Sequence, residues 1–165
     1  MEQRDDRPAP HPRRIMTLQR LIASGFGCGF APVAPGTVAS VVTLLPGALL
    51  LHTYPALLPL TVAVVILVGL WSIRAANADD DPGWVVVDEV AGQLLALCGL
   101  AHISLLGMLL ALLIFRALDV AKPGPIGWAD RQGGAVGVMA DDVIAGAVTA
   151  GILWAIGTHW PALLG

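Results

Sequence analysis

Residues 60–70 read LTVAVVILVGL, and this run lies inside a longer stretch, 21–73, that contains no Asp, Glu, Lys or Arg. Two further stretches, 90–115 and 143–165, are equally free of these residues. A soluble helical domain repeats its charges every turn or two, because each helix needs a face in contact with water. A bilayer protein confines its charges to loops, because a charge at mid-membrane costs several kcal/mol. The pattern therefore predicts an all-α, polytopic membrane bundle.

The composition agrees with this reading. The 165 residues are 56% hydrophobic and 13% charged, whereas soluble domains are about 25% charged, and the mean hydropathy is +0.78. The alternative is a soluble helical domain whose helices are all buried. Cys28 and Cys98 show neither a CxxC nor a Cys/His ligand spacing, so we assign them no disulfide and no metal.

The N-terminal tail carries much of the positive charge. Five of the nine bases fall in the first twenty residues, and three prolines follow one another at alternate positions 8, 10 and 12. We expect a disordered tail over 1–20 and one membrane-embedded domain over 21–165. No compact apolar run with a cleavage site follows, which argues against a signal peptide. By the positive-inside rule, this end of the chain is expected to stay cytoplasmic.

Four apolar segments are expected to form helices. The first, 38–51, is interrupted by Pro46-Gly47 and is short for a full span, whereas 56–73 has a suitable length. The third stretch, 90–115, fits either one tilted helix or two shorter helices, 86–100 and 104–121. We favour the two-helix hairpin, because it returns both charged islands of the chain to one side. The last helix is expected over 141–158.

The charges of the membrane domain form two islands, from Arg74 to Glu89 and from Arg116 to Asp142. Asp88 and Glu89 stand among valines and an alanine, so their carboxylates are expected to lose contact with water. Carboxylates in such a place need a partner, and a hard cation such as Mg²⁺ prefers oxygen ligands. Asp79 and Asp80 are better explained by a solvated turn and a helix cap.

The second island opens with bases and acids on one helix face. Arg116, Asp119 and Lys122 are spaced i, i+3, i+6, and Pro123 ends the helix that carries them. One interpretation is an ordinary surface salt bridge at a helix end. The other is an anion site, which the position directly after an uncharged membrane run favours. Arg131 is a weaker candidate for a phosphate contact.

Two glycine-rich segments approach expected helix starts. Residues 25–37 hold glycines at alternate positions, and either a close ligand contact or simple packing in a membrane-entry loop would explain them. Thr37 is expected to cap the first helix, with the helix amides facing an anion. Residues 133–142 lead to Asp141 and Asp142, which would complement the positive end of the last helix dipole.

Taken together, these segments resemble the phosphatidylglycerophosphatase A family. The resemblance covers about residues 24–146 and rests on four motifs in the family's order: 25–37, 88–92, 115–126 and 137–146. It implies a Mg²⁺-dependent lipid phosphatase of the bacterial inner membrane, which converts phosphatidylglycerophosphate to phosphatidylglycerol and phosphate. Its partner would be this phospholipid and not a nucleic acid. One departure is Ala39, where the family commonly has Gly, and it concerns packing.

The resemblance also suggests roles for individual residues. The family's acidic residues would fall on six positions and its basic residues on two: Asp81, Asp88, Glu89, Asp119, Asp141 and Asp142, and Arg116 and Lys122. We expect catalytic carboxylates at Asp88, Glu89, Asp119, Asp141 and Asp142. We expect Mg²⁺ ligands at Asp81, Asp88, Glu89, Asp119 and Asp142. The expected phosphate contacts are Arg116, Lys122 and Thr37.

Other phosphatase chemistries lack their residues in this chain. No Cys is followed at the sixth position by Arg, no Asp-x-Asp-x-Thr/Val motif occurs, and the four His are scattered. Metal-assisted hydrolysis is what remains, and by the positive-inside rule its acidic site is expected to be cytoplasm-facing. A cation-conducting or transport protein is the alternative from another class. It would place acids inside spanning segments, whereas these acids border the segments.

Overall fold

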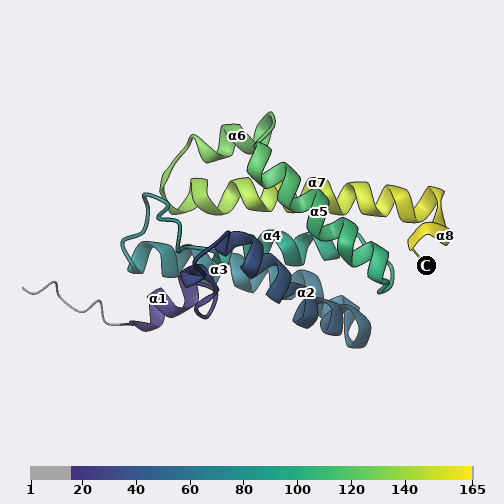
Figure 1. Ribbon diagram of the computed structural model, residues 1–165, viewed down its shortest axis with the longest axis horizontal. Helices are drawn as coiled ribbons and strands as arrows, with labels where there is room; N and C mark the ends of the chain where they lie inside the picture. The colour runs from purple at the N-terminus through teal and green to yellow at the C-terminus, as the bar shows by residue number, and fades with distance from the viewer. Residues whose placement is uncertain (1–15, 165) are drawn as a thin grey trace, which may run out of the picture.

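The computed structural model describes residues 16–164, which form helices and loops and contain no strand (Figure 1). The predicted all-α fold is confirmed. The predicted tail, 1–20, lies mostly outside the described residues, and the first helix begins within its last part, at Leu18. The elements are α1 (Leu18–Ala23), η1 (Cys28–Phe30), α2 (Pro35–Thr53), η2 (Pro55–Leu57), α3 (Leu58–Ala75), α4 (Val87–Leu97), α5 (Leu105–Ala121), α6 (Pro125–Asp130), α7 (Gly134–His159) and α8 (Pro161–Leu164).

Three segments are long and apolar enough to cross a membrane: Pro35–Thr53, Pro55–Ala75 and Gly134–His159. At about 1.5 Å per residue, a helix of this length matches a hydrocarbon core of about 30 Å. The predicted polytopic membrane bundle is therefore confirmed.

Helix α2 runs without a break through Pro46, so the interruption predicted there is wrong. Proline removes one backbone hydrogen bond, but helices in membranes tolerate this where neighbouring helices support them. Here α2 packs against α4, and it is buried both before Pro46, at Ala39 and Thr43, and after it, at Ala48 and Leu51. This packing carries the helix to a full span of 19 residues.

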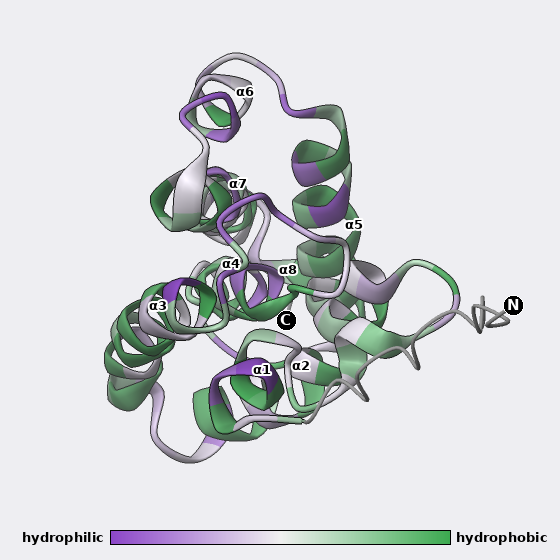
Figure 2. Ribbon diagram, turned by 90° about the vertical axis from the view of Figure 1, so that its left-hand side faces the viewer, coloured by the Kyte–Doolittle hydropathy of each residue, from purple (hydrophilic) through white to green (hydrophobic). Residues whose placement is uncertain are grey.

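The stretch 90–115 forms the hairpin that the sequence favoured. Helix α4 ends at Leu97, and α5 begins after Ser104, whose hydroxyl accepts a hydrogen bond from the Gly107 amide at 3.0 Å. With 11 residues, α4 is only about 16 Å long and cannot span a bilayer. It lies at the centre of the bundle with α2, α3, α5 and α7 around it, so protein replaces lipid along most of its surface (Figure 2).

Helix α7 begins at Gly134, seven residues before the predicted start at Asp141. The Ala135 amide donates a hydrogen bond of 3.0 Å to Asp79 Oδ1, so an acid from the first island caps this helix. Asp141 and Asp142 consequently lie beyond the first turn of α7. The predicted interaction with the positive end of the dipole is wrong for these two carboxylates, because that effect fades after the first turn.

The connections divide the bundle into two ends. Helix α1, the loop before α4 and the segment that contains α6 lie at one end, called here the polar end (Figure 1). The turn at Tyr54, the turn before α5 and α8 lie at the other end. The acids of the described chain lie in the loops of the polar end or in the helical turns nearest these loops, as the hairpin requires. Asp141 and Asp142 lie furthest from a loop, as the eighth and ninth residues of α7.

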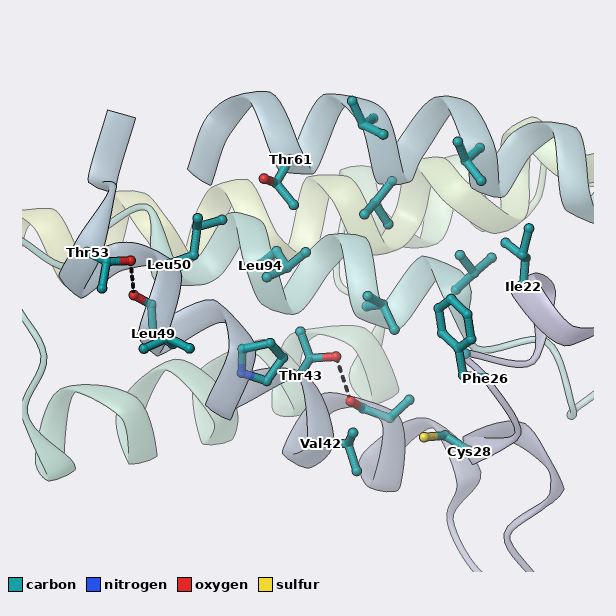
Figure 3. Close-up of a pocket in the computed structure, with 18 residues that line it drawn as sticks. Ile22, Phe26, Cys28, Val42, Thr43, Leu49, Leu50, Thr53, Thr61 and Leu94 are labelled. Carbon is teal, nitrogen blue, oxygen red and sulfur yellow. Dashed lines mark hydrogen bonds between the residues drawn. The ribbon is translucent and has the colours of Figure 1, made fainter. Parts of the chain in front are cut away.

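An apolar groove of about 760 Å³ separates α2 from α3, with α4 as its floor (Figure 3). The hydroxyls of Thr43 and Thr53 lie along it and donate hydrogen bonds of 2.7 and 2.8 Å to carbonyls of their own helix. Neither hydroxyl proton is therefore free to be donated to a ligand, and the groove, which is lined mainly by apolar side chains, suits hydrocarbon.

Candidate active site

A cavity of about 290 Å³ opens at the polar end of the bundle. Four helices and one loop supply its walls: the start of α2, the loop before α4, the first turn of α4, the end of α5 and the second turn of α7. Its lining residues are Pro35, Gly36, Asp81, Gly83, Val85, Asp88, Glu89, Arg116, Asp119, Val120, Lys122, Asp141 and Asp142. The two charged islands of the sequence thus form one site.

Three carboxylates of this cavity converge, and of these Glu89 also lies near a base, Arg116. Ligand oxygens of Asp88, Glu89 and Asp142 all lie within 4.8 Å of one another. Asp88 is 7% exposed and Asp142 is 2% exposed. We call these three residues the acid cluster. They come from α4 and α7, helices that are far apart in the sequence.

The acid cluster has oxygens that nothing in the described chain satisfies. Asp88 Oδ1, Glu89 Oε2 and Asp142 Oδ1 are buried and have no hydrogen-bond partner. Leaving charged oxygens in that condition is costly, whereas a divalent cation would satisfy all three. The donor set, made only of carboxylate oxygens, fits Mg²⁺.

Burial sets the ionisation of the two acids on α4. It raises the pKa of Asp88 well above its usual value, and the neighbouring Glu89 carboxylate raises it further. Burial also raises the pKa of Glu89, although the nearby Arg116 guanidinium partly offsets this. The cluster therefore resists carrying its full negative charge without a cation.

The other side of the cavity consists of paired charges. Arg116 forms an ion pair with Asp119, and its Nη1 lies 3.6 Å from Glu89 Oε1. Lys122 Nζ donates a hydrogen bond of 2.8 Å to Asp141 Oδ2 and a second one to Asp130. We call Arg116, Asp119, Lys122, Asp130 and Asp141 the ion-pair cluster.

The geometry of the α5 end places Lys122 in the cavity. Helix α5 ends at Ala121, and Lys122 follows as its C-cap in the left-handed region, with φ 47° and ψ 50°. Burial lowers the pKa of Lys122, but its hydrogen bonds to Asp130 and Asp141 outweigh this and raise it overall. Lys122 is thus held as a cation. Arg116, Asp119 and Lys122 all line the cavity, but Lys122 lies just outside α5, so the three residues share the cavity and not one helix face as predicted.

Two glycines allow the walls of the site to close. A Cβ added to Gly36 would overlap the Glu89 carboxylate and lie 3.1 Å from Arg116 Nη2. A Cβ on Gly92 would lie 2.6 Å from Phe115 Cζ and 2.7 Å from the Asp142 carbonyl oxygen. Gly36 therefore brings α2 against the first turn of α4, and Gly92 brings α5 and α7 against its second turn.

Some predicted site residues lie elsewhere than expected. The N-cap of α2 is Ala34, with φ 46°, so the prediction that Thr37 caps this helix is wrong. Pro35 and Gly36 line the cavity at this point, and Thr37 does not. Asp81 lies on the exposed rim with φ 51°, and Arg131 is outside the lining. Asp130 was not singled out from the sequence; its pairing with Lys122 depends on the turn at α6.

Comparisons with known proteins agree on one family. A family profile described as phosphatidylglycerophosphatase A matches residues 21–157. The phosphatidylglycerophosphatase A of Escherichia coli K12 is 38% identical over 146 residues, 86% of this chain and 84% of that protein. The Haemophilus influenzae Rd phosphatidylglycerophosphatase A is 33% identical over 145 residues, 85% and 88% of the two chains.

A third relative has a different name. A Bacteroides thetaiotaomicron protein, provisionally named phosphatidylinositol-3-phosphatase, is 36% identical over 143 residues, which cover 81% of this chain and 90% of that protein. No solved structure matches the chain.

Proposed function

This chain belongs to the phosphatidylglycerophosphatase A family, and we propose that it hydrolyses phosphatidylglycerophosphate to phosphatidylglycerol and inorganic phosphate in the membrane. The observation that carries the proposal is the cavity itself. It places the acid cluster beside the ion-pair cluster at one end of three helices that can span a bilayer. In this proposal, oxygen ligands for a cation and bases for a phosphate would meet at the depth of lipid headgroups.

We further propose that Mg²⁺ is the cofactor. Asp88, Glu89 and Asp142 would hold it, because their oxygens converge. Each of the three carboxylates also has one buried oxygen without a hydrogen-bond partner. Asp119 and Asp81, the other predicted ligands, line the same cavity, but Asp119 is ion-paired with Arg116 and Asp81 lies at the rim. When bound, the ion would supply positive charge to the phosphate oxygens and to the attacking water.

The residues of the chain would position the reactants. Arg116 would bind two phosphate oxygens through its planar guanidinium, which Lys cannot reproduce, and Lys122 would contribute a point charge. A carboxylate of the acid cluster would accept the proton of the attacking water. The water oxygen would form the new bond to phosphorus, and the bond to the glycerol oxygen would break, so that phosphate and phosphatidylglycerol leave.

The arrangement of acids disfavours the alternative of an ion pathway. All acidic residues of the described chain lie towards the polar end. Helices α2 and α3 contain no acid, and the acid of α5 is Asp119, near its end. A conduction path needs polar groups along the whole crossing. The acids here end with the cavity, which suits a site that binds a headgroup.

We propose that the polar end faces the cytoplasm of a bacterium, at the inner membrane. Arg20, Arg74, Arg116, Lys122 and Arg131 all belong to this end, and short loops rich in Lys and Arg stay on the cytoplasmic side. Single cysteines introduced at positions 80 and 130 should resist membrane-impermeant thiol reagents in intact cells and react after lysis. Labelling in intact cells would show that the polar end faces the outside of the cell.

The function is tested by phosphate release from purified protein in vesicles. Phosphatidylglycerophosphate and phosphatidylinositol 3-phosphate should be offered separately, because relatives with either name are similar to this chain. We expect release from phosphatidylglycerophosphate, its loss in EDTA and its recovery on adding Mg²⁺. Release only from the inositol lipid would identify phosphatidylinositol 3-phosphate as the substrate instead. Release from neither lipid would exclude the proposed phosphatase activity.

A further inference from the structure

We propose that the acyl chains of the lipid substrate lie along the outward face of α5, and that the headgroup enters the cavity sideways from the bilayer, past Val120 and Pro35. The proposal rests on the proposed function and adds where the hydrophobic part of the substrate binds. It concerns three exposed residues of α5, called here the α5 stripe: Leu109, Leu113 and Val120. They are 44%, 62% and 72% exposed.

The cavity is too small for a whole phospholipid. Its volume of about 290 Å³ is at the lower limit of ligand pockets, about 300–1,000 Å³. The phosphate and the ions that it needs would use this space. Two acyl chains must therefore lie outside, on an apolar surface that begins at the cavity opening.

The residues around the cavity are partly polar and partly apolar. Asp81 and Lys122 are polar lining residues, and Asp130 also approaches Lys122. Pro35, at the start of α2, and Val120, in the last turn of α5, are apolar lining residues, and Val120 is 72% exposed. A lipid needs both kinds of surface at its binding site, because its headgroup stays near water while its chains remain in hydrocarbon.

The α5 stripe shares a helix face with Arg116, the candidate residue for binding the phosphate. Leu109, Leu113, Arg116 and Val120 are spaced i, i+4, i+7 and i+11, so they follow one face of the helix. Arg116 lies between Leu113 and Val120 on this face and turns its guanidinium to Asp119 and Glu89. An acyl chain that lies against Leu109 and Leu113 would thus place the phosphate of its lipid level with Arg116.

The larger groove between α2 and α3 does not offer the same route. No residue lines both the groove and the cavity, although both use α2 and α4. The contact of Gly36 with Glu89 lies on the cavity side of these helices, and Ile22 and Phe26 stand at the groove end nearest the polar loops (Figure 3). The Val86 amide also donates a hydrogen bond of 2.9 Å to the Ala23 carbonyl, which ties α1 to the loop before α4.

The test compares two substrates on variants of the stripe. Val120→Trp and, as a second variant, Leu113→Trp add bulk where the chains would lie, and both positions are exposed, so the fold should persist. Val136→Trp is the matched control, because Val136 is 54% exposed on α7 and outside the cavity. Each protein is assayed on dioleoyl phosphatidylglycerophosphate in vesicles and on the soluble dihexanoyl form, and thermal unfolding in detergent checks folding.

We expect the ratio of kcat/KM for the long-chain to the short-chain substrate to fall about tenfold in folded stripe variants, and to stay at the parent value in the control. An unchanged ratio in the stripe variants, or an equal fall in Val136→Trp, would overturn the proposal. If the parent hydrolyses neither substrate, the proposed function fails instead, and the two failures are therefore distinguishable.

Discussion

The acid cluster and the ion-pair cluster share one cavity but treat their charges in opposite ways. In the ion-pair cluster, Arg116 pairs with Asp119, and Lys122 pairs with Asp130 and Asp141. In the acid cluster, three carboxylates gather with one oxygen of each left without a partner. Since isolated buried charges are costly, the first group pairs its charges within the protein, although Arg116 Nε and Nη1 lack hydrogen-bond partners in the described chain, whereas the second is suited to a cation from solution.

The largest effect is expected from removing charge in the acid cluster. Asp142→Asn or Asp88→Asn should lower kcat about 10²- to 10³-fold, because the cation loses a ligand and the phosphate loses its stabilisation. The same variants should unfold at equal or higher temperature than the parent in EDTA, because they relieve repulsion between buried carboxylates.

Phosphate release and thermal unfolding in detergent measure these two quantities. Asp80→Asn is the control, because Asp80 is exposed and outside the cavity lining, and it should change neither. Parent-like turnover in Asp142→Asn would show that the acid cluster does not serve the reaction.

The next effect concerns Arg116 in the ion-pair cluster. Arg116→Lys keeps the charge beside Asp119 but loses the planar fork, so kcat/KM should fall about a hundredfold. The Mg²⁺ concentration for half-maximal activity should stay at the parent value, which separates phosphate binding from cation binding. Kinetics at varied Mg²⁺ measure both. If Arg116→Lys matched the parent, Arg116 would be only the structural partner of Asp119.

A smaller effect is expected on stability when Mg²⁺ binds without substrate. At about ten times its dissociation constant, the ion should raise the free energy of unfolding by about 1.4 kcal/mol. Asp142→Asn should lose this stabilisation, and Arg116→Lys should keep it. Thermal unfolding with and without Mg²⁺, with Ca²⁺ for comparison, measures the effect. Equal stabilisation of all three proteins would place the ion elsewhere.

The smallest effect should come from the outer edge of the ion-pair cluster. Asp130 is exposed, and Lys122 keeps its bond to the buried Asp141 when Asp130 is changed. Exposed ion pairs contribute about 0.2–1 kcal/mol, so Asp130→Asn should lower kcat/KM by no more than a few fold. Steady-state kinetics beside Asp141→Asn, which removes the buried partner, would test this order. A larger loss in Asp130→Asn would make Asp130 the main partner of Lys122.

The sequence by itself determined that the chain is a membrane bundle whose charges gather in two islands. These features follow from local properties, because the cost of a charge in hydrocarbon depends mainly on the residues around it in the chain. The i, i+3 pair of Arg116 and Asp119 was predictable for the same reason, since helix geometry alone brings those side chains together. The sequence favoured the hairpin of α4 and α5 over one long helix only because the hairpin lets the two islands meet, and the structure decided between them.

Only the tertiary structure decided how the carboxylates divide between the two clusters. Asp142 joins Asp88 and Glu89 because Gly92 and Gly146 let α4 and α7 pack backbone against backbone, and Asp141, its neighbour in the chain, turns instead to Lys122. The passage of α2 through Pro46 and the early start of α7 likewise depend on contacts with other parts of the chain. Adjacent acids look alike in a sequence, and the distance to a base on another helix makes them different.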